Sequence, residues 1–156
     1  MGNLANLYGV LGRLDEGLRL RQDVYSATLK LCGEEHEDTL LEANNYANAL
    51  CRLERYAEAK ALFQKTTPVA RRVLGESHEL TLMMRWNYAR VFYENPDAAL
   101  NDLREAVTMV EDTERIARRV FGGAHPLTEG AAGELQKARA ALHARETPPP
   151  GSGKKI

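Results

Sequence analysis

Asn45-Tyr-Ala-Asn-Ala-Leu50 is the stretch that decides the fold, because related blocks stand 42 residues before it and 42 residues after it. The earlier block is Asn3-Leu-Ala-Asn-Leu-Tyr8, and the later one is Asn87-Tyr-Ala-Arg-Val-Phe92. Each unit also contains a glycine that is followed three residues later by a histidine: Gly33/His36, Gly75/His78 and Gly122/His125. Self-similarity at a fixed period of this size is typical of repeat proteins. The sequence therefore predicts a repeat array.

Each unit is predicted to form two helices. A small residue recurs in the first helix (Ala5, Ala47 and Ala89), and it would let a neighbouring helix approach closely. The second helix is expected to end at the glycine, in the left-handed conformation of a helix cap. The histidine then lies near the start of the next helix. Pro126 supports this assignment, because proline is favoured at the first position of a helix.

The third unit is longer than the other two. Its step from glycine to glycine grows from 42 to 47 residues, and apolar side chains keep helical spacing from Leu100 to Val120. We therefore expect one unbroken second helix there, lengthened by more than a turn. Asn95 is predicted to cap this helix and Pro96 to open it.

The expected organisation is one repeat array over residues 1–145, followed by a disordered tail over residues 146–156 that is rich in proline and glycine. The units are placed at about 1–36, 37–78 and 79–125, with a capping helix at 126–145. Eight helical residues precede Asn45, counted from Glu37, but only two precede Asn3. The first helix is thus expected to be truncated, as in a fragment of a longer array or an exposed stacking end.

Three motifs resemble a known family: Asn45-Tyr-Ala-Asn-Ala-Leu50, Arg55-Tyr-Ala-Glu-Ala59 and Val73-Leu-Gly-Glu-Ser-His78. Helix pairs with these motifs resemble tetratricopeptide repeats. The 42-residue period and the Leu-Gly-x-x-His segment are similar to the kinesin light chain variety. The resemblance covers about residues 1–145. It implies an all-α fold, an α-α superhelix of about three and a half helix pairs, in which the first helices line a concave, peptide-binding face.

Composition excludes several classes of protein. The 21 basic and 22 acidic residues leave a formal net charge of -1, without the basic excess of a protein that binds nucleic acid or an anionic membrane surface. No run reaches the roughly 18 apolar residues that a membrane span needs. The N-terminus does not have the pattern of a secretory signal, and two cysteines (Cys32 and Cys51) are too few for a disulfide framework. A cytoplasmic location is therefore expected.

A polar pair three residues apart recurs on one face of the first helices. Asparagine is a mediocre helix former, but its amide can both donate and accept, as recognition of a peptide backbone requires. The resemblance favours the same role, because related tetratricopeptide proteins use similar asparagine ladders. Arginines on or near this face would add a preference for acidic ligands. The predicted peptide-binding residues are Asn3, Asn6, Asn45, Asn48, Arg52, Asn87 and Arg90. The alternative is that the asparagines hydrogen-bond between neighbouring helices or face water.

No metal site, cofactor or catalytic group is expected. The three repeated histidines occupy equivalent positions in units that lie at least about 8–10 Å apart. Zinc needs its ligand nitrogens at about 2.0–2.1 Å, so these side chains cannot converge on one ion. Their predicted role is to cap the loops. No nucleophile stands in a suggestive arrangement with a base.

The predicted function is a non-enzymatic protein–protein interaction module with an adaptor or scaffold role, which binds a peptide in the concave groove. The helix at 126–145 carries Glu134 and Lys137 in place of the polar pair, so it is expected to cap the array and not to extend the ladder. The alternative function is a structural or oligomerisation segment of a larger assembly. In that case the truncated N-terminal helix would mediate self-association.

Overall fold

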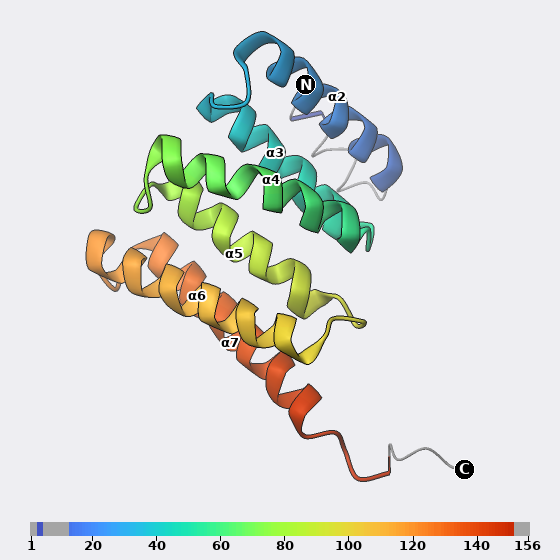
Figure 1. The fold of residues 1–156 in the computed structure, drawn as a ribbon, viewed down its shortest axis with the longest axis vertical. Coiled ribbons are helices and arrows are strands. Elements are labelled where there is room, and N and C mark those ends of the chain that lie inside the picture. The colour runs from blue at the N-terminus through green and yellow to red at the C-terminus, as the bar shows by residue number, and fades with distance from the viewer. Residues whose placement is uncertain (1–2, 5–12, 152–156) are drawn as a thin grey trace.

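The computed structural model describes residues 3–4 and 13–151 of the chain, which are helical over most of their length. The helices run in the order α2 (Leu14–Cys32), α3 (Glu37–Arg52), α4 (Tyr56–Leu74), α5 (Glu79–Glu94), α6 (Leu100–Phe121) and α7 (Pro126–Glu146). Figure 1 shows them stacked one after another along the longest axis of the molecule, with α2 and α7 at opposite ends.

The helices form two layers. Each helix contacts the next one along the chain, and α3 also contacts α5, as α5 contacts α7. Among the described residues there is no corresponding contact between α2 and α4 or between α4 and α6. The first helices of the pairs therefore form a closely packed inner layer, and the second helices are spread apart in an outer layer. This arrangement confirms the predicted all-α fold, an α-α superhelix.

Small side chains allow this close packing. Ala47 on α3 and Ala89 on α5 are both completely buried, as the repeat register predicts, and Ala5 lies outside the described residues. Phe63 of α4 is also completely buried and packs in one cluster with Leu50 of α3 and Val91 of α5. Because the side chain of alanine is small, the helices can approach closely and the larger side chains of neighbouring helices can contact one another. The core is consequently continuous from α2 to α5.

The repeated histidines begin α3, α5 and α7. In each case the ring Nδ1 accepts a hydrogen bond from the backbone N–H two residues later, at 3.1–3.2 Å, as expected of a residue that caps a loop. Pro126 is the first residue of α7, as predicted. Three residues after each histidine comes a buried threonine, and its hydroxyl donates to a backbone carbonyl at or near the end of the preceding helix. Both interactions hold successive helices together at the turn.

The glycines that follow α2, α4 and α6 have the predicted positive φ, but they do not have the predicted left-handed helical conformation. Gly33, Gly75 and Gly122 have φ between 85° and 95°, which only glycine adopts easily. Their ψ values lie between 161° and 170°, far from the roughly +47° of a left-handed helical cap. The chain thus leaves each helix in an extended conformation of positive φ, and this conformation directs it toward the next histidine.

The third unit departs from its predicted form. Helix α6 is unbroken, as expected, but its 22 residues exceed the 19 of α4 by less than a turn. It begins at Leu100, so the prediction that Asn95 caps it and Pro96 opens it is wrong. Asn95 instead follows α5, and its Oδ1 accepts from the N–H of Asp97 at 3.0 Å. The same local bond can start a helix or close a turn, which is why the sequence signal was ambiguous.

Cys51 is buried in the core beside α5, and burial raises the pKa of its thiol to about 11. Cys32 is exposed at the end of α2. No described helix is both long enough and apolar enough to cross a membrane. After α7 the described chain continues without helix through residues 147–151.

Candidate functional site: the inner face

The inner face is the surface of the first helices, and the predicted ladder residues of α3 follow one another along that helix at intervals of three and four positions. Asn45 and Asn48 are half-buried, and Arg52 is exposed at the end of the helix. The covered Oδ1 atom of Asn48 accepts no hydrogen bond from the described residues. Turning this amide toward a ligand would therefore break no hydrogen bond at its oxygen.

Asn87 was predicted to join the same ladder, but the structure places it in an interface between helices. It is 4% exposed, and its Nδ2 donates to Oδ1 of Asn44 on α3 at 3.0 Å. Asn44 is 2% exposed. The assignment of Asn87 to the exposed peptide-binding stripe is therefore corrected in this structure. The reason is that α5 packs on α3 with an offset that directs this amide into the helix–helix contact.

Arg90 lies on α5 one turn beyond Asn87 and is half-buried. Its Nε is 3.1 Å from Oε1 of Glu94 on the next turn of the same helix. Glu94 occupies the repeat position that Arg52 holds on α3. On α5, the Arg90 cation therefore already has the Glu94 carboxylate beside it. Arg52 on α3 is the more exposed of the two arginines.

The contact between α5 and α7 is built differently from the contact between α3 and α5. Trp86 stands at the repeat position of Asn44, and it packs against Gly130 of α7, where an added Cβ would lie 3.1 Å from the indole Cη2. An aromatic ring on a glycine thus replaces the asparagine pair. On α7, Lys137 donates to Glu134 at 3.1 Å, so the two residues that stand in place of the polar pair bond to each other.

The two remaining ladder residues lie near the N-terminus. Asn3 is helical and exposed. Asn6 lies outside the described residues, as does most of the first helix whose truncation the sequence suggested.

Asn44 is the residue of this face that the sequence reasoning missed. Its neighbour Asn45 has an asparagine at the equivalent position of the next unit, Asn87, whereas the position equivalent to Asn44 is Trp86, so the repeat pattern did not indicate Asn44. The available signal was that two asparagines stand side by side in α3, since both cannot point in the same direction from a helix.

The described residues contain no group of three or more histidine, cysteine, aspartate or glutamate side chains placed to hold a metal ion. His36, His78 and His125 each bond to the first turn of their own helix, and they begin three different helices. What the inner face offers a ligand is therefore a set of amides and guanidinium groups on a surface of packed helices.

Comparison with known protein families identifies the repeats of this chain. Two family models match, both described as tetratricopeptide repeat, one over residues 1–38 and the other over residues 39–112. No curated protein matches the chain.

Solved structures match over nearly the whole chain. The nearly identical TPR-like repeats described for a kinesin light chain of Podosopora anserina share 23% identity over 93% of this chain, with a TM-score of 0.71, and a variant of them gives 0.74. BtubC (BKLC) from P. vanneervenii shares 20% identity over 98% of this chain, with a TM-score of 0.67. In all three cases the present chain spans 66% of the solved chain. At these identities the likeness shows a shared fold.

Proposed function

The chain belongs to the tetratricopeptide repeat family, and from this premise we propose that it is a non-enzymatic interaction module that binds a peptide segment on the inner face of α3 and α5. Tetratricopeptide repeats generally bind protein partners. The observation that carries the proposal is the half-buried pair Asn45 and Asn48, in which the covered Oδ1 of Asn48 accepts no hydrogen bond from the described residues.

An amide pair of this kind suits an extended peptide. Each asparagine can donate to a backbone carbonyl and accept from a backbone N–H, so recognition depends on the main chain more than on its side chains. The exposed Arg52, at the end of the same stripe, would favour a ligand with an acidic residue near that point. Arg90 would contribute less, because Glu94 already lies beside it.

Asn87 is not among the proposed peptide-binding residues, although the sequence placed it in the same ladder as Asn45 and Asn48. Asn87 holds α5 to α3 through Asn44, so its replacement would change the shape of the groove before it changed any ligand contact. Among the described residues, no hydrogen bond between helices involves the side chain of Asn45 or Asn48. They are therefore the residues whose mutation reports on binding.

The experiment begins by selecting 12-residue peptides on the wild-type protein from a displayed random library. One selected peptide is synthesised with a fluorophore, and its Kd is measured by anisotropy. Asn45→Ala/Asn48→Ala should fold normally and bind this peptide roughly 30-fold more weakly, since two hydrogen bonds of about 1 kcal/mol each are lost. Arg52→Ala should weaken binding and should reduce its dependence on salt concentration if the peptide is acidic.

The matched control is Asn101→Ala, which removes an exposed asparagine from α6 in the outer layer. It should bind the peptide as the wild type does. Equal Kd values for Asn45→Ala/Asn48→Ala and the wild type, with both proteins folded, would refute the proposed role of the inner face.

Beyond the binding surface, we propose an adaptor or scaffold role in the cytoplasm. Because the chain spans 66% of the solved proteins that it matches, this role concerns the repeat module itself. A motor-related duty does not follow from the shared fold.

A further inference from the structure

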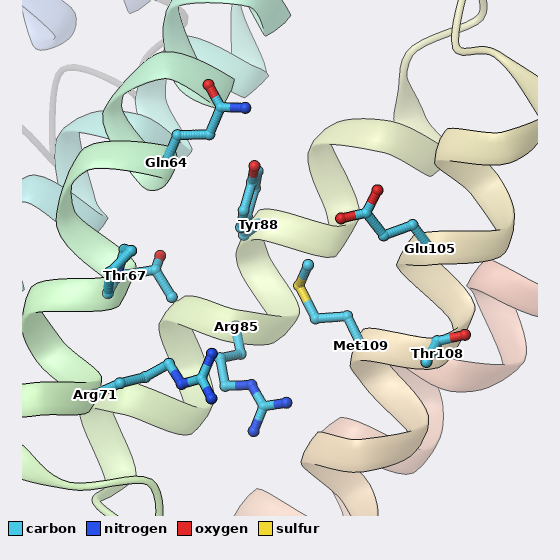
Figure 2. Close-up of a pocket in the computed structure, with 9 residues that line it drawn as sticks. Gln64, Thr67, Arg71, Arg85, Tyr88, Glu105, Thr108 and Met109 are labelled. Atoms are coloured by element: carbon cyan, nitrogen blue, oxygen red, sulfur yellow. The ribbon is translucent and has the colours of Figure 1, made fainter.

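A pocket of about 370 Å³ lies on the other side of α5, in the outer layer. Helix α4 forms one wall with Gln64, Thr67, Pro68 and Arg71, and α6 forms the opposite wall with Glu105, Thr108 and Met109. Arg85 and Tyr88 of α5 complete the lining. Figure 2 shows the guanidinium groups of Arg71 and Arg85 near each other at one end of the pocket and Gln64 with Glu105 toward the other end.

Arg85 is only 8% exposed, as Arg21 is on α2. Its nearest carboxylates are Glu76 at 3.6 Å and Asp112 at 4.0 Å, both beyond hydrogen-bond distance of a guanidinium nitrogen. Its Nη1 is fully covered and donates to no described residue. Burial lowers the pKa of the Arg85 guanidinium, and the neighbouring Arg71 cation lowers it further. A cation in this position lacks an anion at bonding distance.

The two carboxylates nearest to Arg85 are already engaged by other arginines. Glu76 accepts from Arg71 at 2.5 Å, and Asp112 accepts from Arg115 at 2.7 Å. The cluster of charges that act on Arg85 thus contains three arginines and only two carboxylates. The remaining carboxylate of the lining, Glu105, lies toward the other end of the pocket (Figure 2), so the end formed by Arg71 and Arg85 could accept one further negative charge.

Thr67 adds a second polar group without a partner. It is 6% exposed, and its hydroxyl bonds to no described residue. Its neighbour Thr66 is equally buried, but the Thr66 hydroxyl donates to the carbonyl of Leu62 at 2.7 Å. Pro68 follows, and since proline has no N–H it cannot donate to the carbonyl of Gln64. The α4 wall therefore carries unusual hydrogen-bonding capacity at the pocket.

The repeat register shows that Arg85 is not required by the fold. The equivalent position is Ala43 in the preceding unit and Ala132 in the following one. Ala43 lies on α3 and Ala132 lies on α7, which are inner-layer helices like α5, and neither position carries a charge. The arginine is therefore specific to the middle of the array, where the pocket lies.

We infer that this pocket binds a small organic carboxylate with an apolar body, its carboxylate held between Arg85 and Arg71. The volume lies near the lower end of the roughly 300–1,000 Å³ of small-molecule sites. The ring of Tyr88 and the side chain of Met109 supply apolar surface for the body of the ligand. The hydroxyl of Thr67 is a further donor for the carboxylate. This site is separate from the inner face, and it does not depend on the proposed peptide binding.

The test uses N-acetyl-leucine as the carboxylate probe and N-acetyl-leucinamide as the uncharged control. Binding is followed by chemical-shift changes in two-dimensional NMR spectra of the whole chain. N-acetyl-leucine should shift the signals of Thr67, Arg85, Tyr88 and Met109 in a saturable manner, and the amide should bind about tenfold more weakly or not at all. Equal binding of the two probes, or shifts confined to the inner face around Asn45, would overturn the inference.

Arg85→Met tests the cation directly. This variant should fold at least as stably as the wild type, because Glu76 and Asp112 are half-exposed and keep their other arginines. It should lose about tenfold or more of its affinity for N-acetyl-leucine. Arg19→Met, an exposed arginine on α2, is the matched control and should leave binding unchanged. An Arg85→Met protein that is folded and binds normally would refute the assignment.

Thr67→Val keeps the inference falsifiable if Arg85→Met does not fold. Since the Thr67 hydroxyl has no partner, this variant should keep its stability but bind the probe more weakly. Thr66→Val should show the reverse, with lower stability and unchanged binding. A peptide that ends in the same leucine, with a free carboxylate, distinguishes the source of the ligand. Binding only of N-acetyl-leucine indicates a free small molecule, and equal binding of the peptide indicates the end of a polypeptide chain.

Discussion

The hydrogen bond between Asn44 and Asn87 connects two successive repeats, and its loss should be visible in the stability of the whole array. Both side chains are nearly completely buried, and the amide N–H of Asn87 donates to the Asn44 oxygen at 3.0 Å. In Asn87→Ala the buried oxygen of Asn44 loses its donor and has no access to water. Such an orphaned group costs about 1–3 kcal/mol in the free energy of unfolding.

The expected magnitude combines this cost with helix propensity. Alanine is the better helix former by several tenths of a kcal/mol, so the net loss for Asn44→Ala or Asn87→Ala should be about 1–2 kcal/mol. For a chain of this size that corresponds to a decrease of roughly 2–8 °C in Tm. The double variant leaves no orphaned partner, and it should therefore cost less than the sum of the single variants by about 0.5–1.5 kcal/mol.

The assay is urea unfolding followed by circular dichroism, with the four proteins of the double-mutant cycle compared at equal m value. Asn45→Ala is the matched control, because Asn45 is the neighbour of Asn44 on the same helix but is half-exposed. Removal of its side chain should change stability by no more than about 0.5 kcal/mol, toward greater stability. Strictly additive effects in the cycle, or equal losses for Asn44→Ala and Asn45→Ala, would refute the reasoning.

Two further predictions concern α7 and the cysteines. Gly133→Ala should stabilise the protein by about 0.5–1 kcal/mol, since its added Cβ meets no atom within 4 Å, whereas Gly130→Ala should gain less or lose stability because its Cβ would lie 3.1 Å from Trp86; equal Tm increases for the two variants would contradict this. Cys32 is exposed and should react with a thiol reagent at pH 8 in the folded protein, while the buried Cys51, with its pKa raised to about 11, should react only when urea unfolds the chain. Equal rates for the two thiols in the folded protein would show that Cys51 is accessible.

Features that depend on neighbouring residues could be predicted from the sequence. The histidines begin helices through a bond to the N–H two residues later, and the glycines end helices because their φ is positive. Asn95 shows the limit of this kind of prediction. Asn95 was expected to cap a helix, but whether its local bond to Asp97 opens a helix or closes a turn depends on where α6 packs.

The roles of the asparagines could not be predicted in the same way. Asn45 and Asn87 are equivalent in the repeat, yet Asn45 is half-buried and Asn87 is buried against Asn44. The bond between Asn87 and Asn44 joins residues 43 positions apart, one more than the repeat period, so it depends on the offset between α3 and α5. A pattern of residue types carries the repeat period, but it does not contain this offset.

By itself, the sequence determined the period of the array, the helix pairs and the chemistry of their turns, because these depend on contacts within a few residues or on a pattern that recurs along the chain. Only the tertiary structure decided which amides bond between helices and that Arg85 lies buried in a pocket between α4 and α6. The physical reason is that burial and partners at these positions are properties of three packed helices. They follow from how closely the helices approach and where they cross, which no single helix specifies.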